Sequence, residues 1–157
     1  MMVSPEQRLR SLNITLPPAP KPAGLYRPAI QVGNMLYISG QGPRDSKGHF
    51  LTGKLGDGLE KNDGYRAASN TALQLLAVVK EVMGDLSCID SVVKIVGMVH
   101  ATEDFKDHAS VLDGCSELLV HVLGERGYHS RSVMGVSSLT FGMILQVDAV
   151  FALKTSH

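Results

Sequence analysis

The sequence predicts an α+β domain in which a mixed β-sheet carries two helices packed on one face. Three observations support this. A Gly-Asn pair joins two β-rich runs, two later stretches repeat apolar residues at helical spacing, and further β-branched runs follow each helix. The expected order is β-β-α-β-α-β-β, which builds two layers around one core. The elements are strands 29–32 and 35–40, a helix 62–83, a strand 92–101, a helix 109–125, and strands 130–137 and 142–154.

A short helix and a proline-rich arm precede this domain. Ser4 suits a helix N-cap, Pro5 suits the first helical position, and Gln7 can close a capping box, so a helix is expected through Leu12. Residues 16–22 should be extended, because each proline fixes φ and lacks an N–H donor. This arm is expected to be a linker or a surface strap.

The first two strands and the loop after them are recognised from their turn residues. Gly33 and Asn34 both accept positive φ, which makes them a two-residue hairpin turn. The glycine-rich stretch 42–58 follows as a loop. Its Gly53-Lys54 pair is not followed by Ser or Thr, so a phosphate-binding loop is not indicated and a flexible rim loop is expected.

Each of the two long helices should bury one apolar stripe. Asn62 or Asp63 is expected to cap the first helix and Asp107 or a neighbour the second, with Gly127 at its end. Cys115 fits the core better than a nucleophile's role, because no His/Asp partner spacing accompanies it. The two stripes comprise Tyr65, Ala68, Ala72, Leu75, Leu76, Val79 and Met83 on the first helix, and Leu112, Cys115, Leu119 and Val122 on the second.

The last strand and the strand at 92–101 are apolar on both faces. Two helices cover one face of the sheet, and the other face would expose more apolar surface than soluble monomers usually do. The simplest expectation is that other copies of the chain pack on this second face. Side chains alternate along a strand between its two faces. On the last strand, one face carries Met143, Leu145, Val147, Ala149 and Phe151, and the other carries Ile144, Gln146, Asp148 and Val150. On the strand at 92–101, one face carries Val93, Ile95, Gly97 and Val99, and the other carries Val92, Lys94, Val96, Met98 and His100.

Composition narrows the class of protein. The 157 residues suit a single domain, expected at 23–157 behind the helix and arm of residues 1–22. Fifteen basic and fifteen acidic residues cancel, and 19% of the chain is charged against about 25% in an average protein. No basic run marks a nucleic-acid partner, and no membrane span or secretory signal is visible, which favours a cytoplasmic protein. The cysteines and histidines lack metal-ligand spacing, so neither a metal nor a cofactor is expected.

Arg131 stands out because residues 127–157 contain only two other charges, Asp148 and Lys154. A guanidinium on a buried strand is costly unless it meets a carboxylate. Two interpretations remain open: a structural pair with Asp148, or an arginine that binds an anionic ligand. His129 lies two residues earlier and can reach the same face, although a loop or strand-edge position is the more common place for a histidine.

Two motifs resemble the YjgF/RidA family. Residues 26–43 contain a tyrosine, a Gly-Asn hairpin and a Ser-Gly-Gln strand end, and Arg131-Ser132 matches the Arg-Ser strand of the family. The resemblance covers about residues 22–153, and the helix and arm before it look like a divergent branch. It implies a chorismate-mutase-like fold and a homotrimer with three ligand pockets between subunits, in line with the two-sided sheet.

The resemblance also implies site residues. In the deaminase members an arginine grips the carboxylate of a 2-imino or 2-enamino acid, and a glutamate on the last strand positions the hydrolytic water. Carried over by motif, the arginine is Arg131, while Gln146 occupies the glutamate position and cannot accept the proton of water at neutral pH. Asp148 lies on the face of Gln146 and is an alternative acceptor. The implied substrate-binding residues are Tyr26, Ser39, Gly40, Asp113, Arg131 and Val133, with Asp113 at the position of a family asparagine.

Three functions follow as hypotheses. The chain is an enamine/imine deaminase, a non-catalytic regulatory protein that binds a small carboxylate-bearing metabolite, or an endoribonuclease and translation inhibitor. Arg131 favours the first two, and Gln146 counts against catalysis. The neutral chain lacks the basic stripe and stacking aromatics that single-stranded RNA usually needs, which ranks the third hypothesis last.

Overall fold

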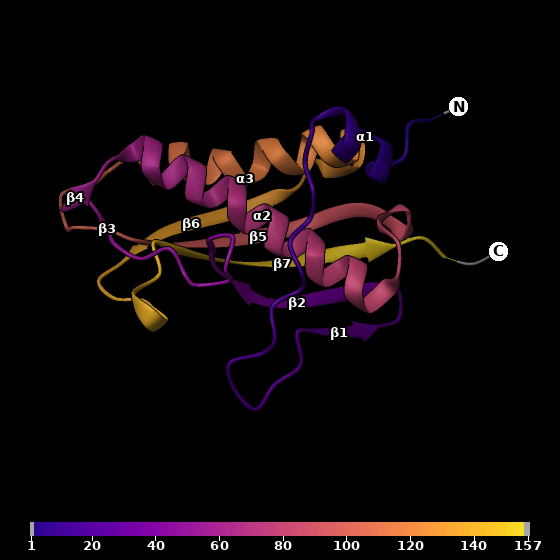
Figure 1. Cartoon of the computed structure of the whole chain (residues 1–157), viewed down its shortest axis with the longest axis horizontal. Helices are drawn as coiled ribbons and strands as arrows, with labels where there is room; N and C mark the ends of the chain where they lie inside the picture. Colours follow the sequence, from indigo (N-terminus) through magenta and orange to yellow (C-terminus); the bar gives the residue numbers. More distant parts are fainter. Residues whose placement is uncertain (1, 156–157) are drawn as a thin grey trace.

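The computed structural model describes residues 2–155, which form two layers, a five-stranded sheet and a pair of helices on one of its faces (Figure 1). The sheet consists of β1 (Ala29–Val32), β2 (Met35–Gln41), β5 (Ile89–His100), β6 (Ser130–Val136) and β7 (Leu145–Leu153), and the helices are α2 (Lys61–Met83) and α3 (His108–Leu123). The strand order is β1-β2-β7-β5-β6, with β5 and β6 parallel and the other neighbours antiparallel. The predicted α+β fold with a mixed sheet is therefore confirmed.

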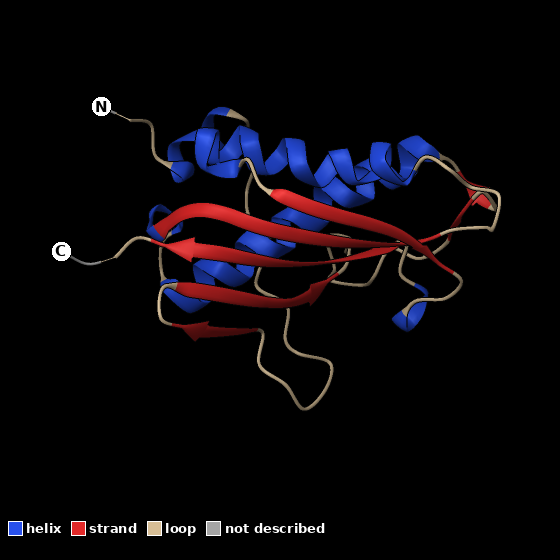
Figure 2. Cartoon of the chain, turned by 180° about the vertical axis from the view of Figure 1, so that it is seen from behind, coloured by secondary structure: helices blue, strands red, loops and turns tan. Residues whose placement is uncertain are grey.

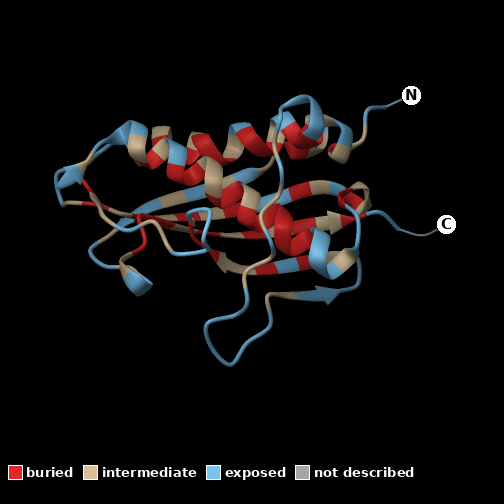
Figure 3. Ribbon diagram, in the orientation of Figure 1, coloured by how far each residue is buried: buried red, intermediate tan, exposed pale blue. Residues whose placement is uncertain are grey.

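The hairpin between β1 and β2 forms as predicted. Val32 pairs with Met35, so Gly33 and Asn34 are the two turn residues, and Gly33 has a φ of +60°. Glycine reaches this conformation without the steric cost that a Cβ brings. The hairpin lies at one edge of the sheet, where most of β1 is exposed (Figure 3).

The helix boundaries differ from the prediction at two ends. Glu60 is the N-cap of α2, and its N–H donates to Asp63 Oδ2 at 2.8 Å, so the predicted caps Asn62 and Asp63 lie within the first turn. The α3 helix ends at Gly124, which has a φ of +66°, and residues Gly124–Gly127 then form a 3-10 turn. The predicted end at Glu125 is therefore two residues too late, and Gly124 rather than Gly127 is the glycine that follows the helix. None of the helices in the described part of the chain is long and apolar enough to span a bilayer.

The hydrophobic core lies between the sheet and the two helices. Of the predicted stripe residues, Tyr65 and Met83 are half-buried and the others are buried. Cys115 is fully buried, and this burial raises the pKa of its thiol to about 12. Its placement in the core rather than at a reactive site is confirmed. The α3 helix begins directly after Asp107, as expected.

The strands show the predicted alternation on β7 but not throughout β5. Every second residue of β7 is buried, from Leu145 to Leu153. On β5, Val92 and Ile95 are both buried, whereas Val93 is exposed, which contradicts the predicted faces. The register with β7 shifts between Val92 and Lys94. A bulge therefore inserts one residue and moves Val92 to the core face.

The N-terminal helix α1 (Pro5–Ser11) has the predicted capping box. The N–H of Gln7 donates to Ser4 Oγ at 3.2 Å, and the N–H of Ser4 donates to Gln7 Oε1 at 2.8 Å. The box satisfies backbone donors that the first helical turn otherwise leaves open. This explains why seven residues form a helix at this point.

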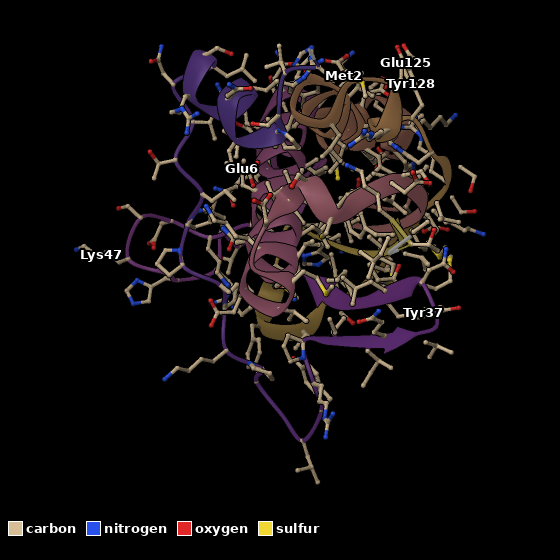
Figure 4. All side chains as sticks on the ribbon, turned by 90° about the vertical axis from the view of Figure 1, so that its right-hand side faces the viewer. Met2, Glu6, Tyr37, Lys47, Glu125 and Tyr128 are labelled. Atoms are coloured by element: carbon tan, nitrogen blue, oxygen red, sulfur yellow. The ribbon has the colours of Figure 1, made fainter. Side chains whose placement is uncertain are left out.

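The helix and the arm pack on the domain as a surface strap. Leu9 is buried in the core. Glu6, labelled in Figure 4, accepts the N–H of Leu86 through its Oε1 at 2.9 Å. Leu16, at the start of the arm, also packs against the core. From there the arm runs across α2 toward the edge of the sheet (Figure 1).

The glycine-rich loop is more regular than predicted. It contains a two-stranded parallel pair, β3 (Lys54–Leu55) and β4 (Gly58–Leu59). Leu55 is fully buried, and Thr52 forms a β-bridge with Met143. The loop is therefore packed onto the domain, which the expectation of a flexible rim loop did not include.

The other face of the sheet is open (Figure 2). Ile30, Tyr37 and Val150 are cross-strand neighbours on this face, and the side chain of Tyr37 is exposed and projects away from α2 (Figure 4). Met134 of β6 lies on the same face and is also exposed. Within residues 2–155, one face of the sheet is thus buried under helices, and the other is uncovered and exposes several large apolar side chains.

Candidate ligand-binding site

A cavity of about 430 Å³ at the adjoining ends of β2 and β7 brings four predicted site residues together. Gln146 enters it from β7, Ser39 and Gly40 form a wall at the end of β2, and Tyr26 lies in the segment before β1. Residues 20–23 of the arm form another wall. The arm thus reaches the pocket of its own chain. We refer to this space as the Gln146 cavity.

A bulge at the end of β2 shapes the wall of the cavity. The register with β7 shifts across Ser39 and Gly40, so both residues leave the regular ladder. A Cβ on Gly40 would lie 2.1 Å from Gln146 Nε2, which means that the amide of Gln146 packs directly on this backbone. Ser39 Oγ donates to the carbonyl of Arg27 at 2.7 Å. The side chain of Gln146 therefore lies against the strand end where it lines the cavity.

Another part of the lining contains a cation that the sequence did not single out. The guanidinium carbon of Arg44 lies 3.8 Å from the centroid of the Phe50 ring, and Phe50 stacks on Phe141 with centroids 5.5 Å apart. All three residues line the cavity. Arg44 lies three residues after Gln41, the last residue of the Ser-Gly-Gln strand end, but no spacing marks it. The turn that brings Phe50 back beneath Arg44 is visible only in the structure.

The charges around the cavity are positive. Among the described residues that line it, Lys21 and Arg44 are basic, and none is acidic or a histidine. Asp148 shares the face of Gln146 but does not line the cavity, and its pKa is raised mainly by burial. No group of three His, Cys, Asp or Glu side chains suited to a metal occurs within residues 2–155. The lining can attract an anion and donate hydrogen bonds to it.

Arg131 lies outside the Gln146 cavity. On β6 it pairs with Ile95, a core residue beneath the helices, and Val133 shares its face and packs against the core. Gln146 lies on the open face of the sheet, on the side opposite to its buried neighbours Leu145 and Val147. The two residues predicted as catalytic therefore lie on opposite faces within one chain.

Arg131 is instead held by α3. Its Nη1 lies 2.9 Å from Asp113 Oδ1 and donates to Ser116 Oγ at 3.0 Å, and its Nη2 donates to the carbonyl of Ala109 at 3.3 Å. The side chains of Arg131 and Asp113 are 26% and 49% exposed, and a pair of this exposure contributes at most about 1 kcal/mol. The partner in the structural pair is thus Asp113, and the predicted pair with Asp148 is wrong.

His129 lies at the favoured strand-edge position, directly before β6, and from there it also reaches this group. Its Nδ1 lies 2.6 Å from the carbonyl of Gly127 and its Nε2 lies 2.9 Å from Ser116 Oγ. Because a carbonyl only accepts, Nδ1 carries the proton and Nε2 accepts from the hydroxyl of Ser116. Ser116 connects His129 to Arg131, a link that the sequence did not reveal. We call Asp113, Ser116, His129 and Arg131 the Arg131 cluster.

A mixed sheet with two helices on one face and a polar cavity at its strand ends defines a chorismate-mutase-like α+β protein. A family model described as "YjgF/chorismate_mutase-like, putative endoribonuclease" matches residues 6–151. The chain belongs to this YjgF/RidA family.

Relatives match over nearly the whole chain. The chain is 37% identical to Protein TCP17 of Trypanosoma cruzi over 147 residues, which cover 93% of this chain and 92% of that protein. The crystal structure of Atu1372 from Agrobacterium tumefaciens, a protein of unknown function, has a TM-score of 0.88 and 38% identity and covers 96% of this chain and 92% of its own. A 2-iminobutanoate/2-iminopropanoate deaminase of Dermatophagoides farinae is 27% identical over 142 residues, covering 90% of this chain and 95% of its own.

Proposed function

We propose that this chain is a RidA-like protein that binds a small carboxylate-bearing metabolite in the Gln146 cavity. The observation that carries the proposal is the lining: amide and hydroxyl groups, two cations and no acidic side chain among the described residues. A small anion is stabilised by such a lining, because its charge meets the cations and its oxygens meet the donors. The volume of about 430 Å³ falls within the range usual for small-molecule sites.

The lining favours binding over turnover. General-base catalysis needs a side chain that accepts a proton and has a pKa near the working pH. The described lining offers neither a carboxylate nor an imidazole for this role. Gln146 Oε1 can orient a water molecule but does not take its proton. The missing proton transfer is worth about 10²- to 10⁴-fold in rate.

Hydrolysis of 2-imino or 2-enamino acids to 2-oxo acids and ammonia is the second candidate. The amide of Gln146 in the cavity wall and the likeness to the mite deaminase favour it. In this reaction Gln146 orients a water that adds to the imine carbon, the nitrogen is protonated by solvent, and ammonia leaves. The rate should be low, because solvent must also remove the proton of the attacking water.

We also propose a homotrimer that forms through the open face of the sheet. Ile30, Val32, Tyr37 and Met134 are 46%, 62%, 48% and 45% exposed on the uncovered strands. Burial of these side chains between copies removes apolar surface from water. Light scattering on the wild type and on Tyr37→Asp tests it: the variant should be monomeric, and a monomeric wild type contradicts it.

Calorimetric titration tests the ligand class. Benzoate and 2-oxobutanoate should bind, while benzamide, which has the shape of benzoate without its charge, should bind at least about 10-fold more weakly. Ammonia release from freshly generated 2-aminoacrylate is measured in parallel. Acceleration over buffer establishes the second candidate. If neither acid binds and no ammonia is released, the proposed function is refuted.

A further inference from the structure

We propose that residues 15–23 form a strap that moves between the closed position seen in the structure and an open position, and that a ligand in the Gln146 cavity holds the strap closed. The motion follows from the contacts of the arm itself, while its control by a ligand rests on the proposed function. Three features support the strap: the arm is stiff, it makes no hydrogen bond to the domain, and it lies over a buried polar atom that has no partner.

The arm is stiff between two bends. Four of the seven residues 16–22 are prolines, so this stretch stays extended whether or not it touches the domain. The bends lie at its ends. Asn13 has a φ of +56°, which turns the chain out of α1, and Gly24 lies in the bend of residues 23–26. Because the stretch between them is already extended, it loses little conformational freedom when it docks on the domain.

Packing alone holds the arm on the domain. In the part of the chain that the structure describes, no hydrogen bond joins any of residues 15–22 to another residue. The next bond along the chain is local, because the N–H of Ala23 donates to Tyr26 Oη at 3.2 Å. Leu16 is the apolar anchor: it packs against the core and is half-buried. A segment with so few contacts opens at a lower free energy than the whole domain unfolds.

The closed arm lies over a polar atom that has no partner. The arm crosses α2 on the side away from the sheet (Figures 1 and 2). A groove of about 530 Å³, which we call the arm groove, is lined by residues 15–20, by the turn 44–48 and by Gln74 of α2. Only 2% of Gln74 is exposed, and its Oε1 has no hydrogen-bond partner among the described residues. Water reaches this oxygen when the arm lifts, so the closed position has a polar cost that the open position lacks.

The other end of the arm connects the strap to the Gln146 cavity. Residues 20–23 form one wall of this cavity, together with Ser39 and Gln146. A ligand that contacts this wall binds the closed strap better than the open one, because the contact exists only in the closed position. The ligand therefore shifts the strap toward the closed position by its difference in affinity. Lifting the strap removes the wall and widens the entrance through which the ligand arrives and leaves.

A thiol placed in the arm groove reports the open position. Gln74→Cys combined with Cys88→Ser leaves two thiols, the new one at position 74 and that of the fully buried Cys115. A small thiol reagent should label position 74 at least about 10-fold faster than Cys115, whose labelling needs a larger opening of the domain. Adding Leu16→Ala removes the anchor. It should speed labelling at position 74 by about 5-fold and change the labelling of Cys115 less.

Control by a ligand is tested with benzoate or 2-oxobutanoate, whichever binds the wild type more tightly in the calorimetric titration. At about 10 times its dissociation constant, the acid should slow labelling at position 74 about 10-fold, because it binds the closed strap and leaves fewer molecules open. Benzamide at the same concentration binds more weakly and should slow the labelling less.

The possible failures are distinguishable. If position 74 and Cys115 are labelled at the same rate, the arm opens only when the domain unfolds and the strap is refuted. If position 74 is labelled faster but the bound acid leaves its rate unchanged, control by a ligand is wrong while the proposed function stands. If neither acid binds the wild type, control by a ligand is refuted, and labelling without ligand still decides the motion. If Gln74→Cys loses its native circular dichroism spectrum, solvent exchange of the Gln74 side-chain amide protons in the wild type, followed by NMR, decides by the same comparison with the backbone amide of Cys115.

Discussion

Replacing Gly114 by alanine tests how closely α2 and α3 must pack to place the Arg131 cluster. A Cβ at Gly114 would lie 2.0 Å from the carbonyl oxygen of Tyr65 and 3.2 Å from the backbone nitrogen of Ser69. Both atoms belong to the backbone of α2, so no rotamer change can relieve the clash. Because non-bonded atoms pack best at about 3.5 Å, the helices must part by more than about 1 Å. Asp113, next to Gly114 on α3, would move with its helix, which would alter its 2.9 Å contact with Arg131.

The magnitude follows from two opposing terms. Overpacking a core costs about 1–3 kcal/mol, and a clash between two backbones should reach the upper end. Alanine recovers about 1 kcal/mol of helix propensity relative to glycine, so the net loss in free energy of unfolding is about 2 kcal/mol. Gly64→Ala is the matched control. Its Cβ would meet the side-chain ends of Leu55 at 2.7 Å and Val111 at 2.9 Å, which can shift, so its net effect should be within about 1 kcal/mol of zero.

Thermal unfolding at one fixed protein concentration is the assay. A loss of about 2 kcal/mol in a chain of this size lowers Tm by roughly 4–8 °C. We expect this shift for Gly114→Ala and little change for Gly64→Ala. The reasoning is refuted if Gly114→Ala has the same Tm as the wild type, or if both variants lower Tm by the same amount. In either case the backbone contact at Gly114 would have no special cost.

Three further variants or treatments test other parts of the structure. Ser4→Ala removes the cap of α1 and should cost about 1 kcal/mol in thermal unfolding, and an unchanged Tm would contradict the role of the capping box. A thiol reagent should leave Cys115 unreacted in the native protein and modify Cys88 slowly, because burial raises the pKa of both thiols, while both react in denaturant; rapid native labelling of Cys115 would disprove its burial. Burial is the main cause that raises the pKa of Asp148 in the folded state, so the folded protein holds the proton of this carboxyl more tightly than the unfolded chain does. The free energy of unfolding therefore falls as the pH rises through the folded-state pKa. Asp148→Asn should therefore raise Tm at pH 7 and have no effect below about pH 4, and equal melting at pH 7 would contradict this.

The order of elements could be predicted because each depends on residues close together in the chain. Gly33 and Asn34 specify the hairpin by their own conformational freedom, and the stripes of α2 and α3 repeat within a few residues. Ser4 and Gln7 likewise form a capping box across three residues. Patterns of this range are present in the sequence before any tertiary contact forms.

The errors occur where a neighbouring element changes the local pattern. Val93 was assigned to the face of Ile95 and Val92 to the opposite face, but a bulge on β5, where its register with β7 shifts, interrupts the alternation there. The cap of α2 moved to Glu60 because Asp63 reaches back to its N–H. Gly124 rather than Gly127 ends α3, since both glycines suit a helix end and the 3-10 turn lies between them. Alternation and capping signals therefore give the element but not its edges.

The sequence by itself determined the fold, the family and half of a site, because its motifs lie at the ends of paired strands. Ser39 and Gly40 meet Gln146 through the pairing of β2 with β7, which a motif can encode. The tertiary structure decided which cations are available. The packing of α3 on the sheet places Asp113 against Arg131, and the turn that returns Phe50 leaves Arg44 at the cavity without a counter-ion. Charge pairing depends on distances between elements far apart in the chain, and those distances exist only once the layers have packed.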